Sequence, residues 1–466
     1  MTQHEPIATP TLGTSLRLSL RQIVQPFIDL VRAPRALWGI NLSYLLEGLT
    51  YFGVVGLLAI FFNQYIGLDD IRAGQMVGIQ TAGITLAMLV LGATVDLIGP
   101  RRALLIALLV MMTGRILLAL SPDVAAARGL WSVPHLVAMG GILGVILGYG
   151  IYQPACYAAV RVFTTKETAA MGYAMLYALM NLGAFLPGLL SPPVRKAHGI
   201  PGVFWVYVAL TLAGTIVVAV FLTRAAVAAV RQKTGTDPDQ SAPEAERKPL
   251  KEQIRYYLRN FPYRDYRFLF FIFILVPVQT LFAHVWLTLP QYCNRAFTGV
   301  VSENYEFFVN FSPLLVFVLT PVVTALSSRR STYSMMIAGT LVMAAPTFFL
   351  AFGPSITNLF AFLILMTVGE AMWSPRFLQW VAEIAPKDMT GIYMGIGQMP
   401  WFLTKVVTSL YSGWFLMTFC PADTPPAELQ TETMWFIYGL IAMLTPVGLF
   451  LARSWMLKRF KTTHEG

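Results

Sequence analysis

Long apolar stretches recur from one end of this 466-residue chain to the other, and they constrain its fold more than any other feature. An α-helix needs roughly 20 apolar residues to cross a hydrocarbon core of about 30 Å. The stretches predict about twelve transmembrane helices, at residues 36–63, 73–97, 102–121, 134–160, 168–191, 202–223, 268–293, 307–327, 332–352, 358–384, 390–417 and 433–452. Only 12% of the residues are charged, about half of what a soluble domain carries. We therefore expect an all-α membrane protein embedded in a lipid bilayer.

The basic residues are distributed unevenly between the two sides that these helices define. Of the 33 Lys and Arg residues, 25 lie on the side that both chain ends share, about five lie opposite and three lie inside spans. Cytoplasmic loops carry such an excess, so we expect both termini on the cytoplasmic side of the cell (inner or plasma) membrane. The net charge of +10 follows from this topology and does not indicate a nucleic-acid partner.

Composition divides the chain into five regions. We expect a cytoplasmic N-terminus with an amphipathic helix (1–35), an N-terminal six-helix bundle (36–223), a polar cytoplasmic linker (224–267), a C-terminal six-helix bundle (268–452) and a cytoplasmic tail (453–466). The two halves are also similar in sequence, because aligning Pro154 with Pro375 superposes Lys166 on Lys387. Halves of the same orientation predict parallel repeats with a cavity between two rocking bundles.

The loop after the second span contains a recognisable motif. It reads Gly92-Ala-Thr-Val-Asp96-Leu-Ile-Gly99-Pro-Arg101-Arg102 and resembles the G-x-x-x-D-x-x-G-R-R/K signature of the major facilitator superfamily. The resemblance implies the major facilitator fold, with two parallel-repeat six-helix bundles. It also implies that Asp96, Arg101 and Arg102 act in conformational gating, because the family uses this loop to latch the bundles together when the outside is open.

Further segments resemble the proton-coupled oligopeptide transporter family. Span five contains Tyr173-Ala-Met-Leu-Tyr177-Ala-Leu-Met-Asn181-Leu-Gly183, close to that family's F-Y-x-x-x-N-x-G. Span one contains Glu47-Gly-Leu-Thr-Tyr51-Phe52-Gly53, and span ten contains Gly369-Glu370 followed by Ser374-Pro375, similar to the family's G-E-L-x-x-S-P. The resemblance implies a peptide transporter-like symporter that moves solutes by alternating access.

Several family charges are replaced by uncharged residues. The first Glu of the span-one motif falls on Tyr44 and its Arg on Gly48, the span-four Lys is Gln153, a further Arg falls on Val55, and the span-seven Glu falls on Val278 beside Gln279. In the family these cations bind the peptide carboxylate and take part in a proton-linked ion pair. We therefore interpret the chain as a divergent relative for which ordinary dipeptides are poor substrates or have their carboxylate bound in an unusual way.

Charged residues inside the predicted spans are few. Glu47 and Glu370 are the acids well inside spans, and Arg115, Arg376 and Lys405 are the bases. An ionised group in hydrocarbon costs at least about 2.5–3.5 kcal/mol, so each should face the bundle interior and have a partner. Glu370 and Lys405 reach similar depth on neighbouring antiparallel helices, and we expect them to pair. Arg115 lies near the outer surface, where its side chain can instead extend to water.

These residues give the candidate site. Glu47 and Glu370 are proposed to bind protons or a substrate amine, with Lys405 and Arg376 as countercharges. His284 is either a proton carrier or a hydrogen-bonded core residue. Neutral polar contacts are expected from Tyr44, Tyr51, Gln153, Asn181, Gln279 and Asn310.

The sequence therefore predicts a monomeric secondary active transporter, a proton-coupled symporter of a small peptide-like or amino-acid-like substrate. Two alternatives stay open: a proton-driven exporter of amphipathic compounds, and a transporter-derived ligand sensor or scaffold. No phosphate-binding loop, metal-ligand spacing or nucleophile arrangement is present, so we expect neither an enzyme nor a cofactor.

Overall fold

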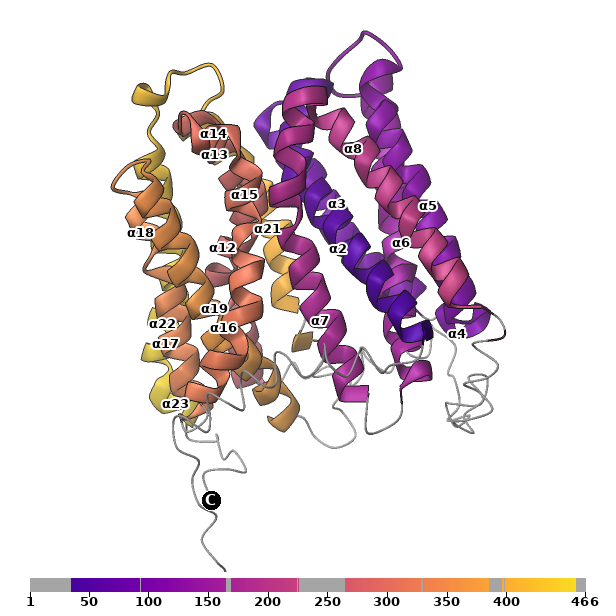
Figure 1. Ribbon diagram of the computed structural model, residues 1–466. Helices are drawn as coiled ribbons and strands as arrows, with labels where there is room; N and C mark the ends of the chain where they lie inside the picture. Colours follow the sequence, from indigo (N-terminus) through magenta and orange to yellow (C-terminus); the bar gives the residue numbers. More distant parts are fainter. Residues whose placement is uncertain are drawn as a thin grey trace, which may run out of the picture.

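The helices form two groups that stand side by side (Figure 1). This computed structural model describes residues 35–92, 94–164, 169–223, 225, 265–327, 330–384, 396–397 and 399–457. The predicted N-terminal amphipathic helix, nearly all of the linker and the end of the tail lie outside these ranges. We call the end at the top of Figure 1, where α13, α14 and α15 lie, the upper end; it corresponds to the predicted extracellular side.

The first group contains the N-terminal helices. They are α2 (Arg35–Phe61), α3 (Asp70–Leu91), α4 (Thr94–Ile98), α5 (Pro100–Leu120), α6 (Val133–Phe163), α7 (Ala169–Phe185) and α8 (Pro187–Phe221). A π-helical turn, η1 (Phe62–Ile66), ends α2, and a 3-10 turn, η2 (Ser121–Asp123), ends α5.

The second group contains the C-terminal helices. They are α11 (Tyr266–Phe273), α12 (Val276–Leu287), α13 (Leu289–Ala296), α14 (Val300–Glu303), α15 (Tyr305–Val309), α16 (Phe311–Ser327), α17 (Thr332–Ala344), α18 (Thr347–Leu350), α19 (Ile356–Ile384), α21 (Met399–Phe419), α22 (Thr431–Leu451) and α23 (Arg453–Leu457). A short 3-10 turn, η3 (Pro426–Glu428), precedes α22.

The prediction of an all-α membrane protein is confirmed. Within the described ranges, eight helical segments are long and apolar enough to cross a membrane, and Tyr305–Thr320 is a shorter apolar helix. One of the eight, Met175–Phe221, is 47 residues long and covers most of two predicted spans, 168–191 and 202–223. The helices α3 and α21 have 22 and 21 residues, which also suffices for a span.

Helix α8 bends where two predicted spans meet. Gly199 has φ 69° and ψ −177°, a conformation that a residue with a side chain rarely adopts. The break frees the backbone N–H of Ile200, which donates to the Tyr65 hydroxyl at 3.3 Å. The chain therefore runs as helix around the upper end, and this carries Arg195 and Lys196 toward the second group of helices.

Candidate functional site

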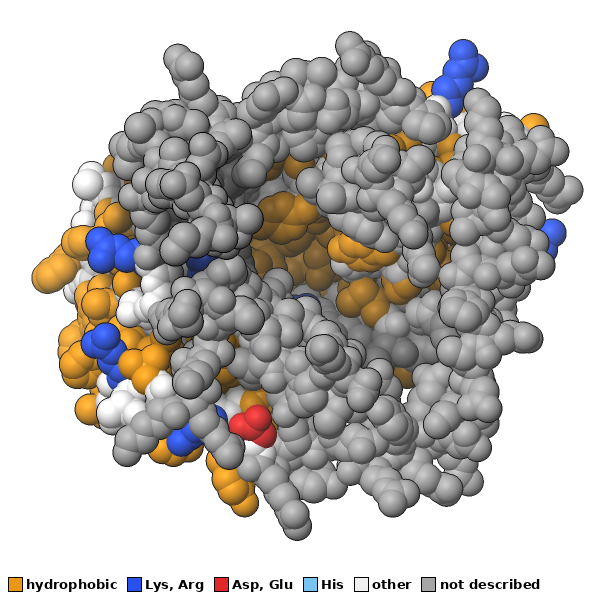
Figure 2. Space-filling view, turned by 90° about the horizontal axis from the view of Figure 1, so that it is seen from below, with side chains coloured by type: hydrophobic (Ala, Val, Ile, Leu, Met, Phe, Trp, Pro, Cys, Tyr) orange, Lys and Arg blue, Asp and Glu red, His pale blue; other side chains and the backbone are white. Residues whose placement is uncertain are grey.

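A pocket opens inside the C-terminal group, on the side that faces the N-terminal helices. Its lining comes from α12, α17, α19 and α21 and consists of Gln279, Phe282, Ala283, Trp286, Met343, Glu370, Trp373, Ser374, Trp401, Thr404 and Lys405. Seen from the lower end, the molecule is hollowed near its centre, and hydrophobic side chains line the hollow (Figure 2).

Two opposite charges face this pocket, Glu370 of α19 and Lys405 of α21. Both side chains are half-buried. The prediction that they form an ion pair is not met in this structure, because neither Glu370 oxygen lies within 4.0 Å of Lys405 Nζ. Lys405 Nζ instead donates to Thr85 Oγ1 of α3 at 3.3 Å, and Glu370 Oε2 has no hydrogen-bond partner among the described residues. The pocket therefore presents an acid and a base that remain separate.

Aromatic rings line the same pocket as the two charges. Trp373 and Trp401 are stacked, with ring centroids 6.1 Å apart, and Phe282 meets Trp286 edge-on at 4.5 Å. Phe52 of α2 approaches Trp286 at 5.7 Å, so the wall touches the N-terminal group. Such rings bind the apolar part of a small molecule, and their faces also attract cations.

Gln279 and His284, both on α12, have different surroundings. Gln279 lines the pocket and accepts a hydrogen bond from Thr404 at 3.5 Å, while its amide nitrogen has no partner within the described ranges. His284 is buried outside the pocket lining; its ring nitrogens contact Thr288 and Tyr411 at 2.7 and 2.9 Å. Its ring also stacks on Tyr438. Of the two predicted roles for His284, these contacts favour the hydrogen-bonded core residue.

Glu47 lies away from this pocket and is paired inside the N-terminal group. Both of its carboxylate oxygens accept from the guanidinium of Arg115 on α5, and Thr50 adds a bond at 3.1 Å. Arg115 also donates to Thr211 of α8 and is only 1% exposed. Two expectations are thus corrected. The countercharge of Glu47 is Arg115 rather than Lys405 or Arg376, and Arg115 does not extend to the surface, because a buried carboxylate is within its reach.

The other predicted polar residues divide between the two groups and the boundary between them. In the N-terminal group, Tyr44 stacks on Tyr152 at 6.2 Å and hydrogen-bonds with Gln153. Tyr51 packs on Tyr149 at 4.7 Å. These contacts place the three residues in the interior of the N-terminal helices, away from the pocket that contains Glu370.

The remaining three residues also lie outside the pocket lining. The amide of Asn181 donates to its own helix at Tyr177. Asn310 lies beside Gly56 and Gly188, at the boundary between the groups, and its side-chain oxygen has no partner in the described part of the chain. Arg376 is half-buried on α19, six residues after Glu370.

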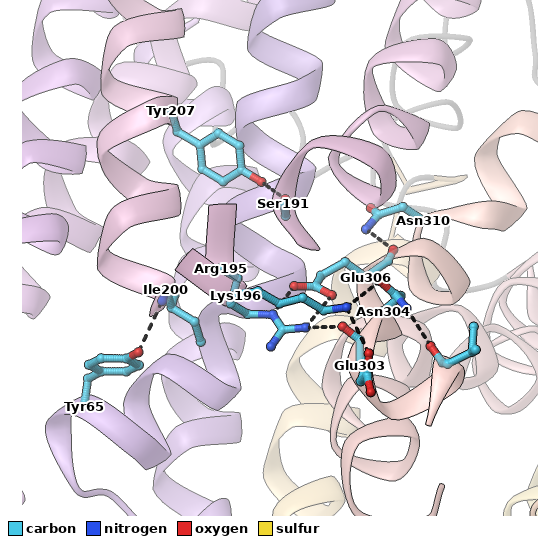
Figure 3. Close-up of polar contacts among 11 residues, drawn as sticks. Tyr65, Ser191, Arg195, Lys196, Ile200, Tyr207, Glu303, Asn304, Glu306 and Asn310 are labelled. Carbon is cyan, nitrogen blue, oxygen red and sulfur yellow. Dashed lines mark hydrogen bonds and ion pairs between the residues drawn. The ribbon is translucent and has the colours of Figure 1, made fainter. Parts of the chain in front are cut away.

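Ion pairs join the two groups at the upper end (Figure 3). Arg195 of α8 binds the buried carboxylate of Glu306 on α15 through Nε and Nη2, and donates to the Glu303 carbonyl at 2.7 Å. Lys196 pairs with the Glu303 carboxylate at 3.1 Å. Elsewhere at this end, Arg295 of α13 makes two bonds of 2.7 Å to Asp70 at the start of α3. We call these three pairs the upper latch. The sequence did not indicate these pairs, because charges at the ends of spans are also expected from the membrane topology alone.

The predicted gating loop lies at the opposite end of the molecule. Arg101 donates through Nε to the carbonyl of Leu222, the residue that follows α8, so it joins α5 to the end of α8 within one group. Arg102 is exposed, and the side chain of Asp96 lies outside the described part. The resemblance implies that this loop joins the bundles when the outside is open. Since the upper end is closed in this structure, that role stays a prediction.

The arrangement suits binding of a small molecule better than covalent chemistry. One acid, one base and one amide project among aromatic rings, which is a set of groups for holding a polar or zwitterionic solute with an apolar part. In the portion of the chain that the structure describes, no three His, Cys, Asp or Glu side chains gather as metal ligands would.

The chain matches one family model and a group of curated relatives. The model described as Major Facilitator Superfamily matches residues 40–409. The multidrug resistance protein MdtH of Yersinia pestis (strain Pestoides F) is 23% identical over 406 residues, which is 87% of this chain and 91% of MdtH. The MdtH of Yersinia pseudotuberculosis serotype O:1b (strain IP 31758) is similar to the same extent.

Solved structures with the same fold include transporters of the POT family. A point mutant of peptide transporter POT in complex with sulfate has a TM-score of 0.70 and 18% identity, with 91% of this chain and 95% of that chain covered. A POT family transporter in complex with 5-aminolevulinic acid has a TM-score of 0.68 and 14% identity, with 91% and 97% covered. PepTSo has a TM-score of 0.67 and 18% identity, with 91% and 99% covered. At these identities the likeness concerns the fold.

Proposed function

Because this chain belongs to the major facilitator superfamily of membrane transporters, we propose that it is a proton-coupled secondary active transporter that carries small amino-acid-like or peptide-like solutes. The substrate site is the pocket that contains Glu370 and Lys405. Protons are the coupling ion, and the monomer is the transporting unit. Ordinary dipeptides bind poorly, because Gln153, Gly48 and Val55 stand where the oligopeptide family has cations.

The separated charges of the pocket carry this proposal. A zwitterionic solute can place its ammonium at Glu370 and its carboxylate at Lys405, with its apolar part against Trp373 and Trp401. Each contact is a charge-assisted hydrogen bond, which is about twice as strong as a neutral one. The coupling proton can bind one oxygen of Glu370 while the other oxygen accepts from the solute ammonium, so that proton and solute are carried together. The same group then serves both coupling and binding.

A second function, export of amphipathic compounds, has its own support. The relatives described above are named multidrug resistance proteins. The pocket's aromatic walls also suit a flat apolar cation, which needs Glu370 but not Lys405. Dependence of transport on Lys405 therefore separates a zwitterion carrier from an exporter of lipophilic cations.

Purified protein in proteoliposomes tests the main proposal. A thermal-shift screen over amino acids, short peptides and 5-aminolevulinic acid selects a solute that stabilises the protein. We expect an inward-directed proton gradient to accumulate this solute in the vesicle lumen, with accumulation abolished by a protonophore. Uptake that only equilibrates, or a protein stabilised by lipophilic cations and not by zwitterions, would contradict it.

The upper latch supports alternating access. Three ion pairs hold α3 and α8 against α13, α14 and α15, while the hollow in Figure 2 opens at the other end. We propose that this is the inward-facing state, with the upper end outside the cell and both termini in the cytoplasm. Opening to the outside then requires all three pairs to separate.

Arg295→Gln should open the pocket to the outside. The change leaves Asp70, which is 7% exposed, without its bidentate partner, and a buried unpaired charge disfavours the closed upper end. With a cysteine at pocket residue Ser374, we expect labelling by a membrane-impermeant maleimide from outside to rise by at least about fivefold.

Arg72→Gln is the matched control, because its partner Asp69 lies on the same side of the boundary. Equal labelling in both variants would remove Arg295 from the latch, and faster wild-type labelling from outside than from inside would overturn the orientation.

A further inference from the structure

Helices α3 and α21 belong to different groups and lie directly against each other along the upper half of the molecule. Their backbones approach so closely that a methyl group on Gly78 would overlap Ser409, and one on Gly413 would overlap the backbone at Asp70. We call this contact the α3–α21 seam. The backbones of α3 and α21 are in close contact from Asp70 to Gly78 of α3. Thr85 lies one and a half to two turns further along α3, at the lower end of the seam.

At its lower end the seam meets the pocket. Lys405, four residues before Ser409 on α21, lines the pocket and donates from Nζ to Thr85 Oγ1 at 3.3 Å. The Thr85 hydroxyl donates to the Thr81 carbonyl of its own helix at 3.2 Å. Its proton is therefore engaged, and its lone pairs face the ammonium. The Lys405–Thr85 bond thus crosses the boundary between the groups and ends inside the candidate substrate site.

The position of Lys405 depends on this bond. An ammonium in a protein interior needs an acceptor, and the Glu370 carboxylate lies beyond 4.0 Å. A carboxylate is a stronger acceptor than a hydroxyl, so an anionic group that enters the pocket competes with Thr85 for the ammonium. When the ammonium turns to that group, the seam loses the polar contact that connects it to the pocket.

We propose that Thr85 is a positioning residue that holds Lys405 at the boundary between the two bundles and thereby couples the occupancy of the pocket to the closure of the α3–α21 seam. The bond forms only when α3 and α21 are together, so it stabilises the empty state whose upper end is closed. This inference rests on the proposed function only in taking the opening of the upper end as a step of transport. It assigns a role to a residue that no sequence motif marked.

Double electron–electron resonance on the empty protein tests the coupling without any substrate or proton gradient. Spin labels at Ala126, between α5 and α6, and at Ala427, on η3, are exposed and lie at the upper end on opposite sides of the boundary. The native cysteines are buried and are replaced by alanine. In wild type we expect the closed distance to dominate. In Thr85→Val we expect the ratio of open to closed populations to rise at least about fivefold, a typical coupling factor.

Conservative and control variants make this result specific. Thr85→Ser keeps the hydroxyl and should restore the wild-type distribution. Lys405→Met should open the upper end as Thr85→Val does. The double variant should open it no further than either single variant, because both changes remove the same bond.

Thr113→Val is the matched control, since Thr113 is an exposed threonine that bonds its own helix at Leu109. A wild-type distribution in Lys405→Met or Thr85→Val, or additive effects in the double variant, would overturn the proposal. Transport failure alone would not produce either pattern.

Discussion

Glu370→Gln should abolish accumulation driven by a proton gradient while leaving the protein folded and inserted. Glutamine preserves the shape of the protonated side chain but cannot release a proton. With an imposed gradient of about one pH unit, one-to-one coupling supplies about 1.4 kcal/mol, enough for about tenfold accumulation. The variant should therefore only equilibrate the solute. The measurement compares accumulation under the gradient with exchange of labelled solute at equal concentrations on both sides.

The matched control is Glu428→Gln, which removes the same charge from an exposed position on η3. It should accumulate solute as the wild type does. Wild-type accumulation by a well-folded Glu370→Gln protein would remove Glu370 from the coupling mechanism. If the variant loses both exchange and accumulation, Glu370 is instead a substrate-binding group and not the coupling group.

Arg115→Met should strongly destabilise the N-terminal bundle. Glu47 is 2% exposed and receives both of its guanidinium contacts from Arg115. Removing one partner of a buried pair leaves an uncompensated charge and typically costs about 3–5 kcal/mol. We expect a markedly lower thermal unfolding midpoint in detergent, measured by the fluorescence of the tryptophans.

The double variant Arg115→Met with Glu47→Gln should recover much of that loss, because no charge then stays unpaired. Arg128→Met is a control at an exposed arginine that bonds nearby backbone carbonyls in the loop after α5. If the double variant is as unstable as Arg115→Met, the loss comes from packing rather than from charge. If Arg115→Met is as stable as wild type, the pair contributes little.

In the proposed transport cycle, the latch and the seam act on the same equilibrium from different places. The latch contacts are ion pairs at the upper surface, whereas the Lys405–Thr85 bond lies at the pocket. Separation of the bundles requires both to break. In this proposal, a solute in the pocket acts on the seam. When no solute is bound, the ion pairs of the latch keep the upper end closed.

The apolar periodicity and the motifs by themselves determined the fold class. Membrane spans are encoded locally, because every backbone polar group in hydrocarbon must be satisfied within its own helix. Glu370, Lys405 and Gln279 could also be selected from the sequence, because a charge or an amide within an apolar span is expensive and must face something polar. All three line the same pocket.

The partners of these groups were decided by the tertiary structure. Glu47 and Arg115 are 68 residues apart, and Lys405 and Thr85 are 320 apart. A helix exposes polar groups in several directions, and the sequence does not state which helix packs against which face. Packing brought Arg115 to Glu47 and directed Lys405 away from Glu370. It also joined Arg195 to Glu306 and Arg295 to Asp70 across the boundary. Each of these contacts depends on how whole bundles dock, so the chain specifies the helices while their docking specifies the pairs.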